Sequence, residues 1–545
     1  MDEENNFNGE NNFTENSNVN DGTLTKSKPN KNKLIIILIV VALIAVLGGI
    51  GAYAVINSNP KVKVFKALKA TSEELKNKET LIEKITGKDF LKDLEEKGTK
   101  QNMKFTLNST NYPQAQQANG AGISIDYSCD QKNKKLMLDI GGEYKGTSIS
   151  NAQIYTDNKK IMISVPKLYN SFFTFDAENI QNQYNDSVFA KNGNKLPNKE
   201  ISVKAFGDDG ELFNKELIDA VVKGYLKENG EKLATIGKNI KVEKSKETKN
   251  MEIGGINQEC TGYDIVISGE DAKTFIGSIY DYMLADEQVK MKITSAAKSS
   301  YIQKGKNYSS TEAMVDDIYK QMKDARDKFE SSVTFDDVKT TIYIDKKGRA
   351  VSIESNTAID NGNNDKLDVK YSSEFKGKDN IGDITDMSME LGNNGEKIKI
   401  DLDNTTTTKD DAINDDMKLV VSFDNKPLNI AIKSEYNNKS GDFDASADFS
   451  AEGQGLTASC NGNANYNKSS KTLKLDFNKI DLKSAIKSTP INISLDGSYS
   501  LTPLENGINE PDGEKLELFK LDENKIGSIV QEMQKNAQGL ASAFK

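Results

Sequence analysis

The chain has 545 residues and a formal net charge of -10, with 82 acidic residues against 72 basic ones. Only two of the basic residues are arginines, Arg326 and Arg349, and histidine is absent. An acidic, arginine-poor chain argues against nucleic-acid binding, which needs a basic face and bidentate arginine contacts. The absence of histidine excludes Ser-His-Asp and Cys-His nucleophiles, zinc sites that contain histidine, and an imidazole acid or base.

Two kinds of catalysis remain open, paired-carboxylate hydrolysis and Ser-Lys chemistry. No pair of side chains stands out among so many acids and lysines, however, and the chain has neither a G-x-x-x-x-G-K-[ST] loop nor a dinucleotide fingerprint between a strand and a helix. We therefore predict a protein that is not an enzyme. No catalytic, cofactor-binding or metal-binding residue is assigned, and no cofactor is expected.

The N-terminal region combines a polar tail with an uncharged segment. Residues 1–33 are rich in Asn, Glu, Ser and Lys, and they are predicted to be a disordered tail. Residues 34–56 carry no charge and, as a helix, would span about 35 Å, enough for a hydrocarbon core of about 30 Å. They predict a single transmembrane helix. The alternative is a cleaved signal peptide, since residues 52–54 read Ala-Tyr-Ala, but the apolar run is too long for one.

The charges beside residues 34–56 set the expected orientation. Lys26, Lys28, Lys31 and Lys33 precede the segment, and long domains translocate largely regardless of their own charges. We expect a single-pass protein of the cell membrane with a cytoplasmic N-terminus and an extracellular C-terminal domain. That domain is too long for one ordinary core. It is predicted to divide into residues 57–245 and 246–545, with the boundary in the lysine-rich stretch 238–250.

Helical spacing of apolar residues follows Pro60, a residue suited to a helix start. Period-2 alternation begins at Met103, and turn-forming segments at 130–134 and 157–160 separate the strands, as in consecutive antiparallel hairpins. One face of this sheet is apolar and should pack on helices. The helical stripes are Val62, Phe65, Leu68, Ser72 and Leu75, then Leu81, Ile85, Phe90, Leu91 and Leu94 before Gly98; the strands lie at 103–107, 123–127, 136–140 and 161–165.

The second part is predicted to be richer in strands. Small residues facing inward and polar residues facing outward favour a wide, twisted or curved antiparallel sheet. The fold class expected for the whole chain is therefore α+β, with large curved antiparallel sheets packed on helices. Helices are predicted at 212–230, from Ser268 and Asp271 to Met283, on Met314, Ile318, Ala325 and Phe329, and on Ile526, Ile529, Val530, Met533, Ala537, Leu540, Ala541 and Phe544 at the C-terminus. Strands are predicted at 263–267, 342–353 as a hairpin, 443–451, 473–477 and 491–495.

The cysteines and the acidic loops are the residues that could form a disulfide or a metal site. The three cysteines are far apart and do not match a metal-binding spacing, and Cys129 and Cys460 share the parity of apolar strand residues, so we interpret both as small buried hydrophobic residues. A disulfide between two of the three cysteines is the alternative. Asp401, Asp403 and the segment 360–365 suggest calcium but do not fit its twelve-residue loop, so solvated Asn- and Asp-rich turns are the interpretation, with a weak calcium site as the alternative.

Two resemblances bear on the fold. Residues 34–79, together with KNKKLMLDIGGEYKG (132–146) and NAQIYTDNKKIMISVPKLYNSFFTF (151–175), resemble an uncharacterised family of membrane-anchored proteins from clostridia and their relatives. That resemblance implies a location and an architecture but no activity. The order of strands and helices and the hairpin TIYIDKKGRAVSIES (341–355) resemble, more weakly, the lipoprotein-carrier half-barrels of the LolA and LppX type. Those proteins hold lipid between a curved sheet and helices.

We therefore expect a non-catalytic binding or structural protein of the cell envelope. The alternative is a carrier of a hydrophobic ligand, either a lipid or a lipoprotein, held in a half-barrel groove. The expected partners are the membrane, through residues 34–56, and a cell-envelope or lipid ligand, but no nucleic acid.

Overall fold

The computed structural model describes residues 60–542 except 192–194, 197–223, 295–310, 361, 363–365, 394, 425 and 486–490. The predicted tail 1–33 and transmembrane helix 34–56 lie outside these residues, as does most of the helix predicted from Leu212. Among the helices that are described, none combines the length and the apolar character needed to cross a membrane.

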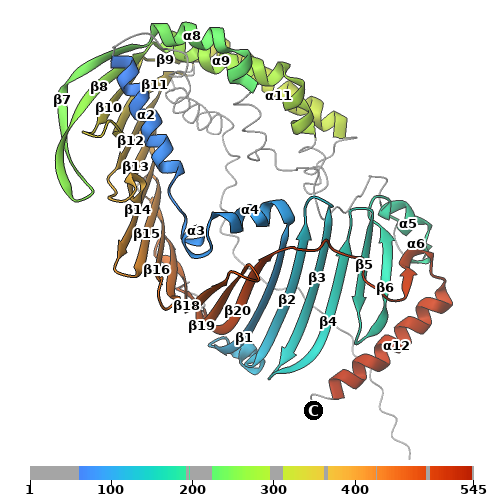
Figure 1. Ribbon diagram of the computed structural model, residues 1–545. Helices are drawn as coiled ribbons and strands as arrows, with labels where there is room; N and C mark the ends of the chain where they lie inside the picture. The colour runs from blue at the N-terminus through green and yellow to red at the C-terminus, as the bar shows by residue number, and fades with distance from the viewer. Residues whose placement is uncertain are drawn as a thin grey trace, which may run out of the picture. The chain divides into compact units, whose positions relative to one another are not determined.

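Two antiparallel meanders make up most of the described chain (Figure 1). The first meander contains the strands predicted at 103–107, 123–127, 136–140 and 161–165, and it adds two more. Its strands are β1 (Thr99–Thr110), β2 (Ala121–Asp130), β3 (Lys135–Tyr144), β4 (Thr147–Thr156), β5 (Lys160–Val165) and β6 (Tyr169–Asp176).

The second meander runs through the C-terminal half of the chain and contains the remaining predicted strands. Its strands are β7 (Lys241–Ile253), β8 (Ile256–Ile267), β9 (Thr334–Phe335), β10 (Val338–Ile344), β11 (Ala350–Asp360), β12 (Lys366–Phe375), β13 (Ile384–Asn393), β14 (Glu396–Lys409), β15 (Ala412–Phe423), β16 (Lys426–Asn437), β17 (Asp442–Ala451), β18 (Gln454–Asn467), β19 (Thr472–Ser484) and β20 (Ile491–Pro503), followed by the short β21 (Lys515–Glu517).

Both meanders belong to one 21-stranded sheet because β1 pairs with β20 over almost its full length. From β7 the sheet continues through β8, β10 and β11 to β20, and from there through β1 to β6. Strand β9 extends β10 along β11, and β21 pairs with β6 as the parallel exception. This arrangement confirms the α+β class, with one sheet where several were expected.

The described α-helices lie before, between and after the meanders, and α9 and α11 lie within the second meander, between β8 and β9. Helix α9 begins where predicted, because the Ser268 side chain accepts a hydrogen bond from the Asp271 N–H and caps it. Helix α12 packs beside β6, with Ile529 buried, while Val530 of the predicted stripe is exposed. The α-helices are α2 (Pro60–Lys76), α3 (Leu81–Thr86), α4 (Lys88–Lys97), α5 (Ile180–Asp186), α6 (Val188–Lys191), α8 (Gly230–Asn239), α9 (Gly269–Ala285), α11 (Thr311–Ser332) and α12 (Glu523–Ser542).

The lysine-rich stretch 238–250, in which the domain boundary was predicted, is mostly strand. Apart from the last two residues of α8 and Ile240, it forms the first ten residues of strand β7, which pairs with β8. The boundary predicted near residue 245 falls inside this strand, and strands from both predicted parts pair in the same sheet. All described residues belong to one compact unit.

The helices after the predicted anchor differ in detail from their sequence pattern. Helix α2 begins at Pro60, but its buried stripe is Val64, Ala67 and Thr71, whereas Ser72 of the predicted stripe is exposed. The second predicted helix is divided into α3 and α4 by Gly87, whose φ of 82° is unfavourable for other residues. Gly98 ends α4 as predicted, also with positive φ.

Candidate functional site

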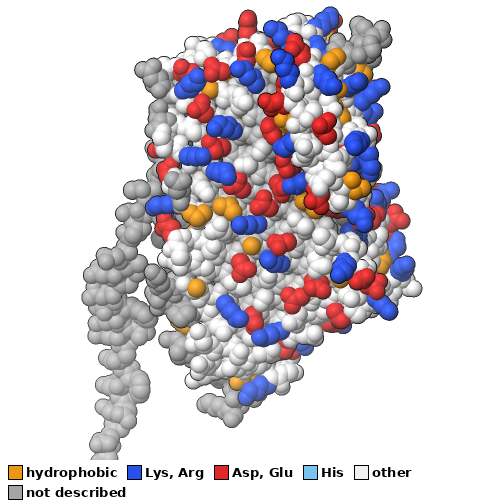
Figure 2. Space-filling view, turned by 90° about the vertical axis from the view of Figure 1, so that its left-hand side faces the viewer, with side chains coloured by type: hydrophobic (Ala, Val, Ile, Leu, Met, Phe, Trp, Pro, Cys, Tyr) orange, Lys and Arg blue, Asp and Glu red, His pale blue; other side chains and the backbone are white. Residues whose placement is uncertain are grey.

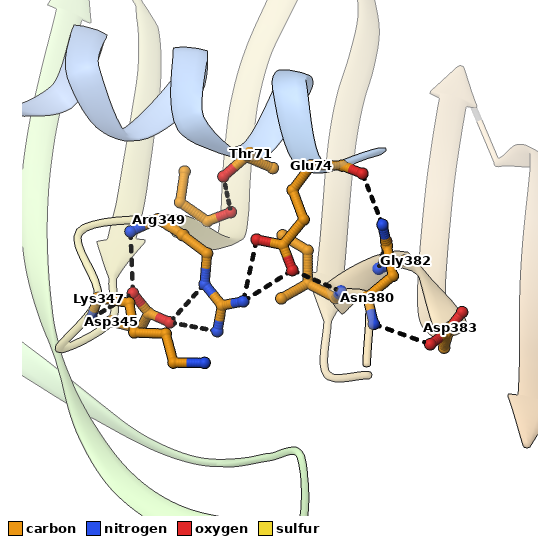
Figure 3. Close-up of polar contacts among 10 residues, drawn as sticks. Thr71, Glu74, Asp345, Lys347, Arg349, Asn380, Gly382 and Asp383 are labelled. Carbon is orange, nitrogen blue, oxygen red and sulfur yellow. Dashed lines mark hydrogen bonds and ion pairs between the residues drawn. The ribbon is translucent and has the colours of Figure 1, made fainter. Parts of the chain in front are cut away.

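Arg349 is the centre of a buried polar cluster that joins helix α2 to the sheet (Figure 3). It lies at the end of the β10–β11 hairpin turn, at the start of β11, where Asp345 accepts hydrogen bonds from the Lys347 and Arg349 N–H groups. The same turn therefore places the Asp345 carboxylate beside the Arg349 guanidinium. Glu74, near the end of α2, approaches the guanidinium from the opposite side.

The guanidinium bridges the two carboxylates through charge-assisted hydrogen bonds. Its Nε and Nη2 donate to Asp345 Oδ2 at 2.9 and 2.7 Å, and its Nη1 donates to Glu74 Oε1 and Oε2 at 2.9 and 3.0 Å. Arg349 is 7% exposed and the Asp345 side chain 0%. Burial alone would lower the pKa of Arg349, but these hydrogen bonds outweigh it and raise the pKa.

Further contacts fix α2 beside this cluster. Glu74 Oε1 also accepts from the Ile381 N–H at 3.1 Å, and the Asn380 amide donates to the Glu74 carbonyl. The Thr71 hydroxyl donates to the Ala350 carbonyl at 2.9 Å, and both residues are buried. We call the contacts of Thr71, Glu74, Asp345 and Arg349 the α2 latch. It connects the element that follows the predicted anchor to two loops of the sheet.

The chemistry of the α2 latch is structural. Both of its carboxylates accept hydrogen bonds from one guanidinium, so both are engaged in contacts within the fold. The nearby Cys260 thiol is not an activated nucleophile either, because burial and the charge of Asp345 raise its pKa to about 11. The latch therefore holds α2 in place on the sheet.

A second feature is an apolar surface on strands β15 to β18. Directly paired residues of antiparallel strands lie on the same face, and alternate residues along a strand share that face. The registers pair Leu419 with Ile430, Ile430 with Phe449, and Phe449 with Leu456. We call the set the apolar surface; its members are Leu419, Val421, Phe423, Leu428, Ile430, Ile432, Ala447, Phe449 and Leu456.

No member of the apolar surface is buried by the described residues. Phe423 is 53% exposed, Leu456 45% and Phe449 40%. Single exposed hydrophobic residues are ordinary, but a contiguous group in strand register is typical of a binding surface. Phe449 also belongs to the predicted strand 443–451, whose apolar side was expected to face a core; its exposure corrects that expectation for this end of β17.

The same face is covered at the other end of these strands. Ile413, Tyr436 and Ala464 form a buried cluster, against which Leu81 and Ile85 of helix α3 pack. The ring of Phe90 in helix α4 contacts Tyr466 edge-on, with ring centroids 5.3 Å apart. Helices α3 and α4 thus cover one end of the face, and the apolar surface continues beyond them.

The opposite face of the sheet is polar. Its cross-strand contacts include Ser388 donating to Asp401 at 2.7 Å, and Thr457 donating to Asp448 at 2.7 Å. In the view of Figure 2, basic and acidic side chains are interspersed and hydrophobic ones are scattered. A face with charges of both signs is typical of a solvated sheet surface.

The residues considered for calcium do not converge on a site. Asp401 forms an ion pair with Lys399 at 2.9 Å; burial raises its pKa, but Lys399 and Ser388 outweigh this, so the net pKa is lowered. Asp403 lies on the same polar side of β14 and is exposed. Most of 360–365 lies outside the described residues, and in the part of the chain that is described no cluster of three potential ligands is found.

All three cysteines are free, so the alternative of a disulfide between two of them is wrong. Cys129 is buried, as interpreted from its strand parity. Cys460 is only partly buried, because it lies between Ala445 and Ile480 on the partly covered face of β18.

The sequence carried a weak signal for Arg349 and none for Glu74. Arginine is so rare in this lysine-rich chain that its use at a hairpin indicates a need for the planar, bidentate guanidinium. Glu74 is one of many acids and lies 275 positions from Arg349. The apolar surface could be detected as alternation along 419–423 and 428–432, but its exposure could not.

Comparison of the chain with protein-family models gives no match, and comparison with curated proteins gives none either.

Proposed function

We propose that this chain is a membrane-anchored, non-catalytic protein that binds or organises another component of the cell envelope. The anchor is the uncharged segment 34–56, and the bulk of the chain lies outside the cytoplasm. The apolar surface is the binding surface. The observation that carries the proposal is the set of in-register apolar side chains on β15 to β18, none of which the described residues bury.

The α2 latch supports this assignment by fixing the position of the sheet. Only residues 57–59 separate the predicted anchor from α2, and three extended residues span at most about 11 Å. Because the latch joins α2 to the β10–β11 hairpin, the sheet would be held close to the membrane.

Lysine substitutions on the two faces of the same strands test the binding surface. Ile430 pairs with Phe449 on the apolar surface, and Asn429 pairs with Ser450 on the polar face. We expect Ile430→Lys with Phe449→Lys to weaken binding of the apolar dye 8-anilinonaphthalene-1-sulfonate about tenfold, since two large apolar contacts are lost. Residues 57–545 are used, and they are expected to be soluble and rich in β-structure by circular dichroism.

The matched control is Asn429→Lys with Ser450→Lys, which changes the charge equally on the same two strands. Dye binding should stay within about twofold of the unsubstituted protein, because the polar face makes no contact with the dye. If both variants lose dye binding equally, or if neither variant loses it, the apolar surface is not the dye site.

The membrane topology is tested by protease treatment of intact, wall-stripped cells. Protease should digest the region after Pro60 and spare an epitope placed before Lys26. Changing Lys26, Lys28, Lys31 and Lys33 to Gln should raise the inverted fraction, because positive charge near a membrane helix favours the cytoplasmic side. Protection of the C-terminal bulk would place it in the cytoplasm, and its release with a new N-terminus after Ala54 would identify a signal peptide.

The second candidate function is that of a carrier for a hydrophobic ligand. It is favoured by the composition of the apolar surface, whose side chains are all aliphatic or aromatic and offer no hydrogen-bond donor or acceptor. Denaturing extraction of the purified protein followed by mass spectrometry separates the two candidates. Recovery of about one lipid per chain would support the carrier function. Absence of a bound lipid would support binding of a macromolecular partner.

A further inference from the structure

Helices α3 and α4 cover the same face that carries the apolar surface, and they are held much less firmly than α2. Helix α2 has three buried residues and the α2 latch. Helix α3 has no buried residue, and Ile82 within it is 43% exposed. Helix α4 has one buried residue, Phe90.

Two glycines of this segment differ in the space around their backbone. At Gly87, between α3 and α4, φ is 82° and no atom lies within 4 Å of the position a Cβ would occupy. At Gly98, after α4, a Cβ would lie 2.2 Å from the Cys129 carbonyl oxygen, so the backbone is tightly packed there. The chain is therefore fixed at the α2 latch and Lys78, whose ammonium donates to the Gly382 carbonyl at 2.8 Å, and again at Gly98; between them it can bend at Gly87.

What the two helices cover is a continuation of the apolar surface. Strand β15 alternates regularly, so Ile413 under α3 shares a face with Leu419, Val421 and Phe423. Ile413 is buried, whereas none of the other three is. Removing α3 and α4 would therefore enlarge the apolar surface toward Tyr436 and Ala464.

We infer that α3 and α4 form a displaceable cover, which opens between the α2 latch and Gly98 and controls how much of the apolar surface a ligand can reach. This inference rests on the proposed function, since it concerns regulation of the same surface. Its attachments are the contacts of Leu81 and Ile85 with the sheet, the Phe90 ring against Tyr466, and the ion pair between Asp93 and Lys471.

Thiol labelling of the full chain in lipid nanodiscs measures the opening. The substitution Ala464→Cys places a thiol under the cover, and Cys460→Ala removes the nearby native thiol. Buried Cys260 serves as the internal reference, because it lies in a cluster packed against Leu75 of α2 and away from α3 and α4. We expect the thiol at position 464 to react with a maleimide at least about a hundredfold faster than Cys260, since local opening needs less free energy than global opening.

Two variants weaken the cover to different degrees. Phe90→Ala should accelerate labelling at position 464 by about tenfold or more while leaving Cys260 unchanged, because only the cover loses a contact. Asp93→Asn keeps the Phe90 contact and should give a smaller acceleration, so it serves if Phe90→Ala does not fold. The inference is overturned if the thiol at position 464 reacts with the maleimide at the same rate as Cys260, both in the Ala464→Cys protein and when Asp93→Asn is added to it.

The labelling and dye experiments fail independently. If labelling at position 464 is fast but the Ile430/Phe449 and Asn429/Ser450 variants bind the dye equally, the inference of a cover stands and the proposed binding surface is wrong. If labelling is slow but only the Ile430/Phe449 variant loses dye binding, the proposed binding surface stands and the inference of a cover is wrong.

Discussion

Replacing Arg349 by alanine is expected to lower the free energy of unfolding by about 3–5 kcal/mol, the usual cost of removing one partner from a buried ion pair. The substitution leaves the Asp345 carboxylate without its cation at a position with no solvent exposure, and it releases Glu74 on α2. Arg349→Lys should lose less, because an ammonium restores the charge but cannot bridge both carboxylates in the same geometry. Urea unfolding of the full chain in detergent, followed by circular dichroism, measures the loss.

Arg326, the other arginine of the chain, provides the matched control. It pairs with Asp281 at 2.8 Å on the exposed sides of α11 and α9. Arg326→Ala should therefore cost far less than Arg349→Ala, because solvent replaces a surface ion pair. If the two alanine variants unfold at the same urea concentration, the α2 latch does not stabilise the fold as described.

Replacing Gly497 by valine is expected to destabilise the joint between the two meanders by about 3 kcal/mol, the upper part of the usual range for overpacking. Gly497 lies on β20, where it pairs with Phe105 of β1 and Phe477 of β19. A Cβ there would lie 2.1 Å from the Lys104 carbonyl oxygen and 2.6 Å from the Phe105 ring. Strands β1 and β20 would have to separate locally.

Gly392 of β13 is the control for this substitution, because no atom lies within 4 Å of its Cβ position. Gly392→Val should change the unfolding midpoint little, since valine suits a strand and meets open space. Hydrogen exchange should show that Gly497→Val speeds amide exchange in β1 and β20 more than in β13. Uniform acceleration across the sheet would mean that the two meanders are not joined at this position.

The local elements could be predicted from the sequence because their signals are local. The Ser268 cap of α9 and the 130–134 turn each depend on residues that are close in the chain. Alternation also identified many of the strands, since it requires only neighbouring residues. The stripe of α2 was misassigned because apolar residues occur on more than one side of this helix, so the buried Val64 and Ala67 did not stand out, and buried Thr71 carries no apolar signal.

The long-range arrangement could not be predicted in the same way. Alternation specifies which face of a strand is apolar, but it does not specify which strand lies beside it. Pairing of β1 with β20 joins residues about 400 positions apart, and the α2 latch joins residues 275 positions apart. For this reason the sequence predicted two parts where the strands form one sheet. It also predicted a domain boundary where β7 pairs with β8.

The central claim is that the apolar surface contacts a ligand or partner in the native cell envelope. Site-specific photocrosslinking in intact cells tests it most directly, with benzoylphenylalanine placed at Phe449 or, on the polar face of the same strand, at Ser450. We predict that irradiation yields a discrete adduct with lipid or protein at position 449 and none at position 450. The same adducts at both positions, or no adduct at position 449, would contradict the claim.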